Sequence, residues 1–194
     1  MSKHGKDGRP DQGRTGGADD RAAGADPLVA LARRALESYV RDRTVVEPAP
    51  LPGLEQRRAG VFVSLHLPDG SLRGCIGTTQ PTQPGIAQEI VRNAISAATR
   101  DPRFYPVRPD ELAGLDVSVD VLGEAEEVGG TEDLDPKRFG IIVQAADGRQ
   151  ALLLPDLEGV DTVDQQVCIT CRKGGIDPDR DTYRILRFEV QRHH

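Results

Sequence analysis

Two pairs of short segments, each joined at an Asp-Gly pair, constrain the fold of this chain more than any other feature. In residues 60–67 apolar side chains alternate with polar or aromatic ones, which is the pattern of a half-buried β-strand, and the other three segments are short and contain branched apolar residues. The segments are residues 60–67 and 72–78 around Asp69-Gly70, and residues 140–143 and 149–154 around Asp147-Gly148. Asp-Gly between two such runs is a strong hairpin signal. The sequence therefore predicts two antiparallel hairpins.

The first hairpin has a predicted register. A two-residue loop at Asp69-Gly70 would pair Pro68 with Ser71. The same register places Ser64 opposite Cys75 and His66 opposite Arg73.

Helical patterns and further strands separate the hairpins. Helices are expected from Asp26-Pro27, from Pro84, and over residues 163–173 before Gly174-Gly175. Single strands are expected at residues 115–122 and 183–190. The order helix, hairpin, helix, strand, hairpin, helix, strand predicts an α+β fold, with mostly antiparallel, mixed sheets and helices packed on them. The hairpin–helix–strand order occurs twice, which indicates two subdomains from a duplicated unit.

Composition sets the domain limits and excludes several classes of function. Residues 1–25 mix Gly, Asp, Lys and Arg, so we expect a disordered tail before a single domain at residues 26–192. The net charge of −6 and the aromatic content of 4% argue against nucleic acid as a partner. The absence of a long apolar run or a leader argues against a membrane partner, and three cysteines fit a cytoplasmic protein.

The segment SLRGCIGT at residues 71–78 is the strongest candidate for chemistry. Strand alternation places Arg73 and Cys75 on one face, with Gly74 and Gly77 beside them. A guanidinium near a thiol favours the thiolate, and glycines let a ligand approach the backbone. The turn from Thr78 leads into a helix whose free N–H groups could receive an anion. The alternative is a packed strand in which Cys75 is a small buried side chain.

Other residues extend or compete with this site. Arg103 beside Arg73 would form a clamp for a phosphate or carboxylate, with Ser118 facing it and Lys173 adding charge. The alternative is that Arg103 pairs with Asp101 or Glu111.

The remaining cysteines and histidines give weaker signals. Cys168 and Cys171 form a CxxC pair near a helix end, where thiolates are disfavoured, so buried structural thiols are the preferred interpretation. His66 could form a dyad with Cys75, although a solvated histidine is the simpler reading, and His193 and His194 are expected in a flexible terminus. No metal site and no cofactor are expected, because no P-loop, GxGxxG, HExxH or EF-hand spacing occurs.

Several of these segments resemble the AMMECR-type domain family. SLRGCIGT resembles its LRGCIG signature, and residues 93–112, NAISAATRDPRFYPVRPDEL, resemble its DPRF segment. LDVSVDVL, LLLP and CRKGGI resemble later family segments, so the resemblance covers roughly residues 28–190. Gly174 is a departure, since the family usually has Ala there.

The resemblance implies a two-part α+β domain and a possible set of partners. Bacterial and archaeal members are often named AmmeMemoRadiSam system protein A, which implies association with a Memo-type protein and a radical S-adenosylmethionine protein. The first hypothesis is therefore a partner or ligand-presenting protein that binds an anionic small ligand through the LRGCIG surface. The alternative is a small enzyme with Cys75 as thiolate nucleophile or acid–base group.

Overall fold

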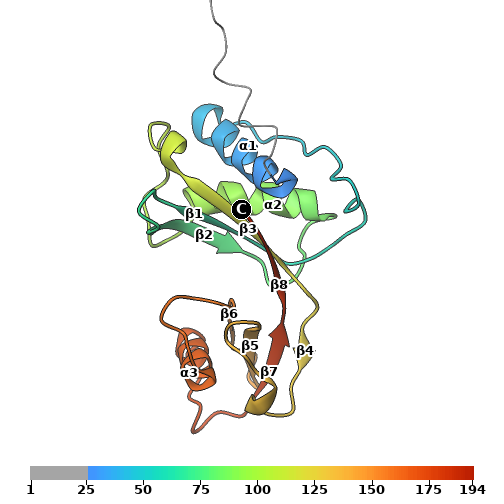
Figure 1. Ribbon diagram of the computed structural model, residues 1–194, viewed down its shortest axis with the longest axis vertical. Coiled ribbons are helices and arrows are strands. Elements are labelled where there is room, and N and C mark those ends of the chain that lie inside the picture. Colours follow the sequence, from blue (N-terminus) through green and yellow to red (C-terminus); the bar gives the residue numbers. More distant parts are fainter. Residues whose placement is uncertain (1–25) are drawn as a thin grey trace, which may run out of the picture.

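The computed structural model describes residues 26–194, which form two stacked halves (Figure 1). The first half contains α1 (Pro27–Asp42), β1 (Val61–His66), β2 (Leu72–Gly77), α2 (Ile86–Thr99), β3 (Asp116–Leu122) and β8 (Val190–His193). The second half contains β4 (Glu126–Glu127), β5 (Gly140–Ala145), β6 (Gln150–Leu153), α3 (Val163–Lys173) and β7 (Tyr183–Phe188). The tail predicted at residues 1–25 lies outside the described residues.

Each half is built on one antiparallel sheet. The strand orders are β2-β1-β3-β8 and β4-β7-β5-β6, and every pairing found within residues 26–194 is antiparallel. The predicted α+β class is confirmed. In both halves the third strand pairs with the first strand of the hairpin and runs parallel to the second. A helix connects these two parallel strands, which lie on either side of the first hairpin strand. The repeated hairpin–helix–strand order is therefore present in both sheets.

The two halves exchange their fourth strands. After β3 the chain enters the second sheet as β4, and after β7 it enters the first sheet as β8. The two crossing segments touch, because the Gly123 N–H donates to the Glu189 carbonyl at 2.8 Å. The single strand predicted at residues 183–190 is thus wrong. It is two strands in different sheets, and the second continues past the predicted domain end to His193.

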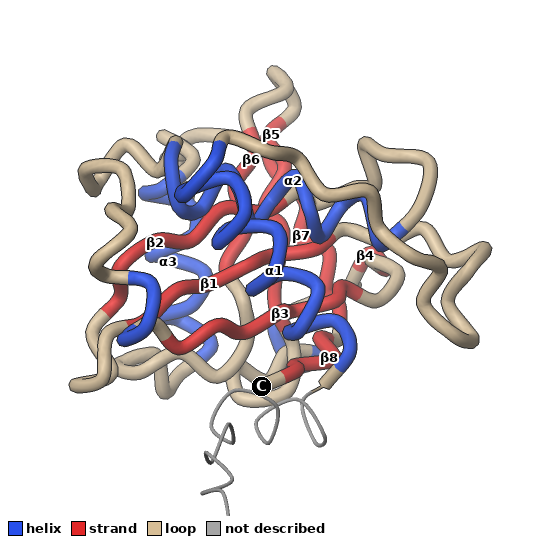
Figure 2. The backbone as a smooth tube through the Cα atoms, turned by 90° about the horizontal axis from the view of Figure 1, so that it is seen from above, coloured by secondary structure: helices blue, strands red, loops and turns tan. Residues whose placement is uncertain are grey.

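Helices α1 and α2 cover one face of the first sheet (Figure 2). The alternation in β1 is confirmed, since Val61, Val63 and Leu65 are buried against these helices. The face of β1 that carries Phe62 and Ser64 turns away from the helices, toward the second half.

The ends of the described chain are joined at the start of α1. Asp26 caps the helix as predicted, accepting the Leu28 and Val29 N–H groups at 2.8 and 3.4 Å. Its other carboxylate oxygen lies 2.6 Å from Nδ1 of His193. Burial opposes ionisation, but the His193 and backbone hydrogen bonds outweigh it and lower the pKa of Asp26. The flexible terminus expected for His193 is wrong, because β8 pairs with β3.

The first hairpin closes differently from the prediction. The Leu67 N–H donates to the Ser71 carbonyl at 2.9 Å, so the loop has three residues and ends at Gly70 with a φ of 82°. Pro68 has no N–H and cannot donate in the closing pair that the prediction required. Ser64 lies opposite Cys75 as predicted, but a bulge after Leu65 pairs His66 with Leu72 instead of Arg73.

The helices agree closely with the sequence pattern. Helix α3 has the predicted bounds and begins with a capping box between Thr162 and Gln165. Helix α2 begins at Ile86 after an N-cap at Gly85, two residues later than expected. No helix within residues 26–194 has the length and apolarity needed to cross a membrane.

Candidate functional site

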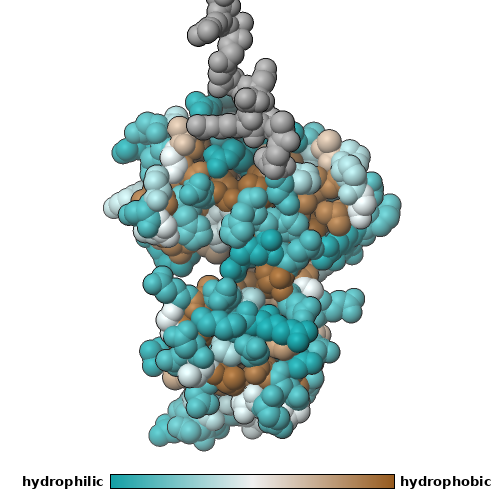
Figure 3. Space-filling view, viewed as in Figure 1, coloured by the Kyte–Doolittle hydropathy of each residue, from teal (hydrophilic) through white to brown (hydrophobic). Residues whose placement is uncertain are grey.

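A cleft of about 690 Å³ lies between the two halves. Figure 3 shows the hollow at the waist of the molecule, with apolar side chains visible beside it. The first sheet supplies a mainly polar wall, in which Ser64, Cys75, Ser118, Asp120 and Arg192 lie with the apolar Phe62, Leu72 and Ile76. The second half supplies an apolar wall from β6 and the loop after it, with Leu152, Leu153, Leu154, Leu157 and, at the end of α3, Lys173.

A row of small polar side chains crosses three strands of the polar wall. Ser64 in β1 lies opposite Cys75 in β2 on one side and Ser118 in β3 on the other. The Ser64 hydroxyl donates to Sγ of Cys75 at 3.2 Å. Alternation along the three strands turns this row away from α1 and α2, which is why these side chains reach the cleft.

Burial raises the pKa of the Cys75 thiol above its usual value. The hydrogen bond from Ser64 and the charge of Arg103 act in the opposite direction but are outweighed, and the carboxylates of Asp120 and Asp101 add to the rise. A thiol in this setting is protonated at neutral pH. The thiolate expected beside Arg73 is therefore not what the geometry favours.

Arg73 turns away from the cleft and holds the loop that follows α2. Its Nε and Nη2 donate to the Glu111 carboxylate at 2.8 and 3.1 Å, and its Nη1 donates to the Tyr105 carbonyl at 3.1 Å. Only 13% of the Arg73 side chain is exposed. Because the carboxylate occupies the guanidinium fork, Arg73 acts as a structural link between β2 and this loop.

Asp101 and Arg103 bind the backbone of Cys75. The Cys75 N–H donates to Oδ2 of Asp101 at 2.8 Å, and Nη2 of Arg103 lies 3.4 Å from the Cys75 carbonyl. Arg103 also donates to Asp101 from Nε and Nη2, at 2.9 and 2.7 Å. Strand β2 is at the edge of its sheet, so these side chains supply hydrogen bonds that a neighbouring strand would otherwise make. The signature segments LRGCIG and DPRF therefore meet at one residue.

The same contacts set the charge of Asp101. The hydrogen bond from Arg103 is the main cause that lowers the pKa of Asp101 to about 2, and burial opposes it. Further N–H donors from Cys75 and Arg103 stabilise the carboxylate. Asp101 is ionised at neutral pH and holds Arg103 in a fixed position.

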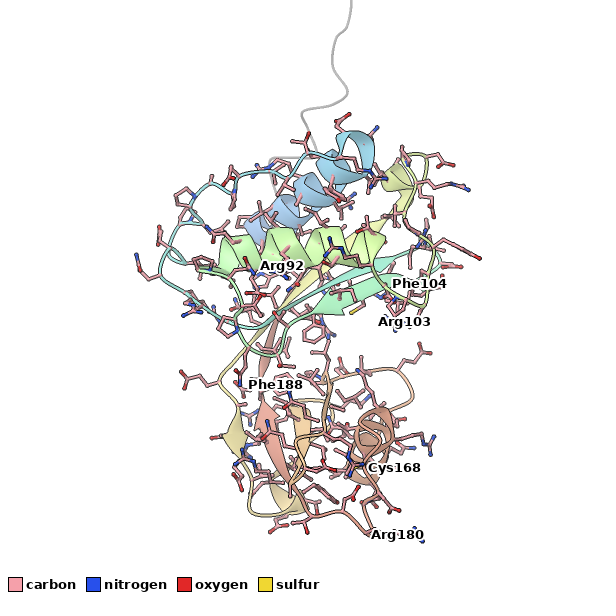
Figure 4. All side chains as sticks on the ribbon, turned by 180° about the vertical axis from the view of Figure 1, so that it is seen from behind. Arg92, Arg103, Phe104, Cys168, Arg180 and Phe188 are labelled. Atoms are coloured by element: carbon pink, nitrogen blue, oxygen red, sulfur yellow. The ribbon has the colours of Figure 1, made fainter. Side chains whose placement is uncertain are left out.

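The arginine clamp expected from the sequence is present only in part. Both guanidinium groups lie near the Phe104 ring, with Cζ to centroid distances of 6.0 Å for Arg73 and 5.5 Å for Arg103. Figure 4 shows Arg103 and Phe104 together at the side of the first sheet that faces the second half. Each arginine is already paired with a carboxylate. Arg103 lines the cleft with 54% of its side chain exposed, and Arg73 does not line it.

Three other residues of the LRGCIGT segment pack against protein. A Cβ at Gly74 would overlap the Ala97 carbonyl of α2, and a Cβ at Gly77 would overlap the Phe62 ring. These glycines admit a helix and an aromatic ring, so we do not assign them to a ligand. The Thr78 hydroxyl donates to Glu89 at 2.7 Å. None of the three lines the cleft between the described halves.

The sequence analysis did not identify Glu89, a buried carboxylate with several hydrogen bonds. It is fully buried on α2 and also accepts from the N–H groups of Thr82 and Gln83, at 2.7 and 2.8 Å. Burial opposes ionisation, but these bonds and the one from Thr78 outweigh it and lower the pKa of Glu89. Glu89 thus fixes the loop between β2 and α2. The cluster of Thr and Gln residues before the helix was the available signal.

The first-sheet wall of the cleft contains a second ion pair, which the sequence analysis did not predict. Arg192 in β8 donates to Asp120 in β3 from Nε and Nη2, at 2.8 and 3.3 Å. Asp120 is buried, and β8 lies beside β3 only because the chain crosses between sheets. Local sequence carries no signal for that crossing.

Lys173 enters the cleft from the second half. Its Nζ donates to the Leu152 carbonyl at 3.0 Å. Among the ion pairs found within residues 26–194, none involves Lys173. It lines the same cleft as Arg103 and Ser118, so the structure brings these three candidates to one cavity.

Of the remaining sequence candidates, the two other cysteines lie outside the cleft and His66 lines it. Cys168 is exposed and Cys171 is buried, and both are free thiols. Burial and the neighbouring Cys168 raise the pKa of Cys171. His66 lines the cleft, where the bulge places it opposite Leu72. In the part of the chain that the structure describes, no group of three His, Cys, Asp or Glu side chains is arranged to hold a metal.

Comparisons with known proteins agree with this architecture. A protein of Thermotoga maritima is 52% identical over 172 residues, which cover 88% of this chain and 98% of that one. A protein of Clostridium acetobutylicum is 49% identical, and the match covers 87% of this chain but 36% of that longer protein. A crystal structure of an uncharacterized protein from Pyrococcus horikoshii is similar with a TM-score of 0.76 at 34% identity, over 85% of this chain and 88% of that one.

The family model named AMMECR1 matches residues 29–193. That range includes both motifs that meet at Cys75, both sheets and the exchanged strands. The similar relatives and the shared fold point the same way. On these grounds the chain belongs to the AMMECR1 family.

Proposed function

We propose that this protein is a binding component that holds an anionic small ligand in the cleft between its halves and presents it to partner proteins. One observation carries the proposal, which is that Cys75, Arg103, Ser118 and Lys173 line a single cavity of about 690 Å³. Small-molecule sites in proteins usually measure roughly 300–1,000 Å³ and combine apolar walls with a few polar groups. The cleft has both properties.

The state of Cys75 favours binding over catalysis by this residue. A nucleophilic thiol needs a lowered pKa or an adjacent base. Burial raises the pKa of Cys75, and its neighbour Ser64 donates a hydrogen bond to sulfur instead of removing a proton. Cys75 then contributes shape and a weak hydrogen-bond donor to the cleft wall.

The resemblance to AmmeMemoRadiSam system protein A supports the choice of partners. We assign as partners a Memo-type protein and a radical S-adenosylmethionine protein, acting in the cytoplasm. The loop after α2 offers a contact beside the cleft, since Tyr105 is 91% exposed there and its backbone is held by Arg73. A rigidly held, exposed aromatic residue is typical of the anchors that dominate protein interfaces.

Co-elution with these partners from the same organism tests the proposal. The full chain, Cys75→Ser, Tyr105→Ala and the control Arg180→Ala would be titrated against each partner on a size-exclusion column. We expect a complex for the full chain, Cys75→Ser and Arg180→Ala, and at least about tenfold weaker binding for Tyr105→Ala.

Two results would contradict the proposal. No complex with either partner at about 100 µM, with the proteins folded, would remove the presenting role. Loss of binding in Cys75→Ser, with an unchanged circular dichroism spectrum, would show that binding requires the thiol itself.

A further inference from the structure

Resting on the proposed function, we propose that the ligand of the cleft is a monocarboxylic acid with an apolar body, its acid group bound at Lys173. Three features of the cleft carry this inference. They are the balance of charge in its walls, the position of the Lys173 ammonium, and the apolar surface beside that ammonium.

The buried carboxylates of the cleft are neutralised by arginines, which leaves the exposed Lys173 without a partner among them. Its buried carboxylates, Asp101 and Asp120, are paired with Arg103 and Arg192 at 2.7 and 2.8 Å. Lys173 is the remaining cation of the lining and has no carboxylate partner within residues 26–194. One positive charge without a partner matches one negative charge on a ligand.

The charges at the mouth disfavour ligands with a greater negative charge. Asp156 and Glu158 are exposed on the loop after β6, and both line the cleft. Lys173 also lies at the C-terminal end of α3, where the helix carries partial negative charge. These groups repel a second negative charge, so a phosphate dianion or a nucleotide polyphosphate fits poorly. Phosphate sites commonly use the free N–H groups of a helix N-terminus. The C-terminal end of α3 presents carbonyl groups instead.

The Lys173 ammonium is held and still has free donors. One of its three N–H groups donates to the Leu152 carbonyl at 3.0 Å, which fixes the nitrogen beside β6. Two donors remain for a ligand, and a carboxylate can accept both. The geometry therefore places an acid group next to the Leu152 backbone.

Apolar side chains lie on both sides of this position. Leu152, Leu154 and Leu157 come from the second half, and Phe62 and Ile76 come from the first sheet. Part of this surface joins the two halves in a small apolar cluster that includes Leu152 and Phe62. A hydrocarbon chain or ring in the cleft would bury against these side chains and exclude water from the acid group.

Three matched probes test the ligand class with the full chain. Hexanoate, hexanol and hexyl phosphate each contain six carbon atoms in an unbranched chain and carry one, zero and about two negative charges at pH 7.5. Binding would be followed through the methyl NMR signals of Leu152 and Leu154. We expect hexanoate to bind at least about fivefold more tightly than either other probe.

Two variants locate the charge that the probe recognises. Lys173→Met keeps an unbranched apolar stem and removes the charge, and it should abolish the preference for hexanoate while leaving the binding of hexanol unchanged. The control Arg180→Met removes a cation at the far end of the second half (Figure 4) and should bind all three probes as the unmodified chain does. Because hexanol reports on the cleft itself, a folding defect in Lys173→Met would be visible as a loss of both.

The outcomes separate the ligand class from the proposed function. Equal binding of hexanol and hexanoate, or tighter binding of hexyl phosphate, would overturn the monocarboxylate and leave the cleft as a binding site. An unchanged hexanoate preference in Lys173→Met would overturn the role of that residue. If none of the probes shifts the Leu152 and Leu154 signals at millimolar concentration, the proposed binding function fails together with the inference.

Discussion

In the first half, the edge strand β2 is bridged at Cys75 by the buried Asp101 and the Arg103 that it holds. In the second half, the edge strand β6 has the same place in the topology, and its Leu152 carbonyl accepts a hydrogen bond from Lys173. Both caps come from the chain at or just after the end of the crossover helix. One cap is an ion pair between a buried carboxylate and a half-exposed arginine, and the other is a single lysine.

The two halves share the hairpin–helix–strand topology but present different side chains to the cleft. The first half adds α1 and has a core that includes both helices, so its sheet can carry buried carboxylates on the opposite face. The second half turns leucines toward the same cleft. The repeat supplies two facing walls, and the side chains on each wall decide that one is polar and the other apolar. The chemistry of the site therefore depends on the difference between the halves.

Removing each edge cap is expected to give the largest contrast. Asp101→Ala should lower the free energy of unfolding by about 2–3 kcal/mol, because the Cys75 N–H loses its acceptor and Arg103 loses its partner. Lys173→Met should lower it by less than about 1 kcal/mol, since the Leu152 carbonyl loses one donor near solvent. Urea unfolding followed by circular dichroism measures both, and equal losses would contradict the distinction between the caps.

Acid should weaken the first half through the same carboxyl group. The pKa of Asp101 is about 2 in the folded chain against 3.8 for an unperturbed group. The unfolded chain therefore binds the proton more readily, and stability falls as pH decreases from about 4 to 2. The loss should approach about 2 kcal/mol over that range. Asp101→Asn should remove this part of the pH dependence in urea titrations at pH 2, 3, 4 and 5, and an unchanged slope would show that other carboxylates cause it.

One glycine in each half packs against side chains, and the two should respond differently to substitution. Gly77→Ala must displace the Phe62 ring and should cost about 1–3 kcal/mol. Gly174, at the end of α3, has a φ of −86° and would bring a Cβ within 3.1 Å of Ala151 and Ile176 side-chain carbons. Gly174→Ala should change stability by less than about 1 kcal/mol, because these are side chains that can shift slightly. Thermal unfolding measures both, and a greater loss in Gly174→Ala would reverse the comparison.

Cysteine labelling is expected to show the smallest difference, and it reports directly on the exposure and pKa of Cys75. Iodoacetamide should react first with the exposed Cys168, more slowly with Cys75, and with Cys171 only on unfolding. Because the pKa of Cys75 is raised, its rate should still increase above pH ~8.5, the value of an unperturbed thiol. Peptide mass spectrometry at several pH values measures each site. Fast labelling of Cys75 at pH 6–7 would restore the thiolate nucleophile.

Local patterns predicted most of the secondary structure. Asp26 marks the start of α1, Gly174-Gly175 marks the end of α3, and the alternation in β1 identifies its buried side. The Ser64–Cys75 pairing also follows from the hairpin pattern, although the loop length was wrong. These features depend on residues within a few positions of one another, so a sequence reading can reach them.

The candidate site was predicted by residue type and much less well by contact. Cys75, Arg103, Ser118 and Lys173 share the cleft, while Arg73 is turned toward Glu111 and two glycines pack under other groups. A strand pattern predicts which face of the sheet a side chain occupies. It does not predict which distant carboxylate an arginine on that strand will bind. Glu111 lies 38 positions from Arg73, and that pairing depends on how the loop after α2 folds back.

The three helices, the two hairpins and the position of β3 follow from short-range rules of backbone geometry and burial, and the residues alone predict them. The tertiary structure decided the rest, including the exchange of β4 and β8, the Asp120–Arg192 pair and the cleft between the sheets. The exchange brings residues 72 positions apart into contact. Such contacts depend on the packing of whole sheets, because the free energy that selects them is spread over many buried side chains and is not written in any one segment.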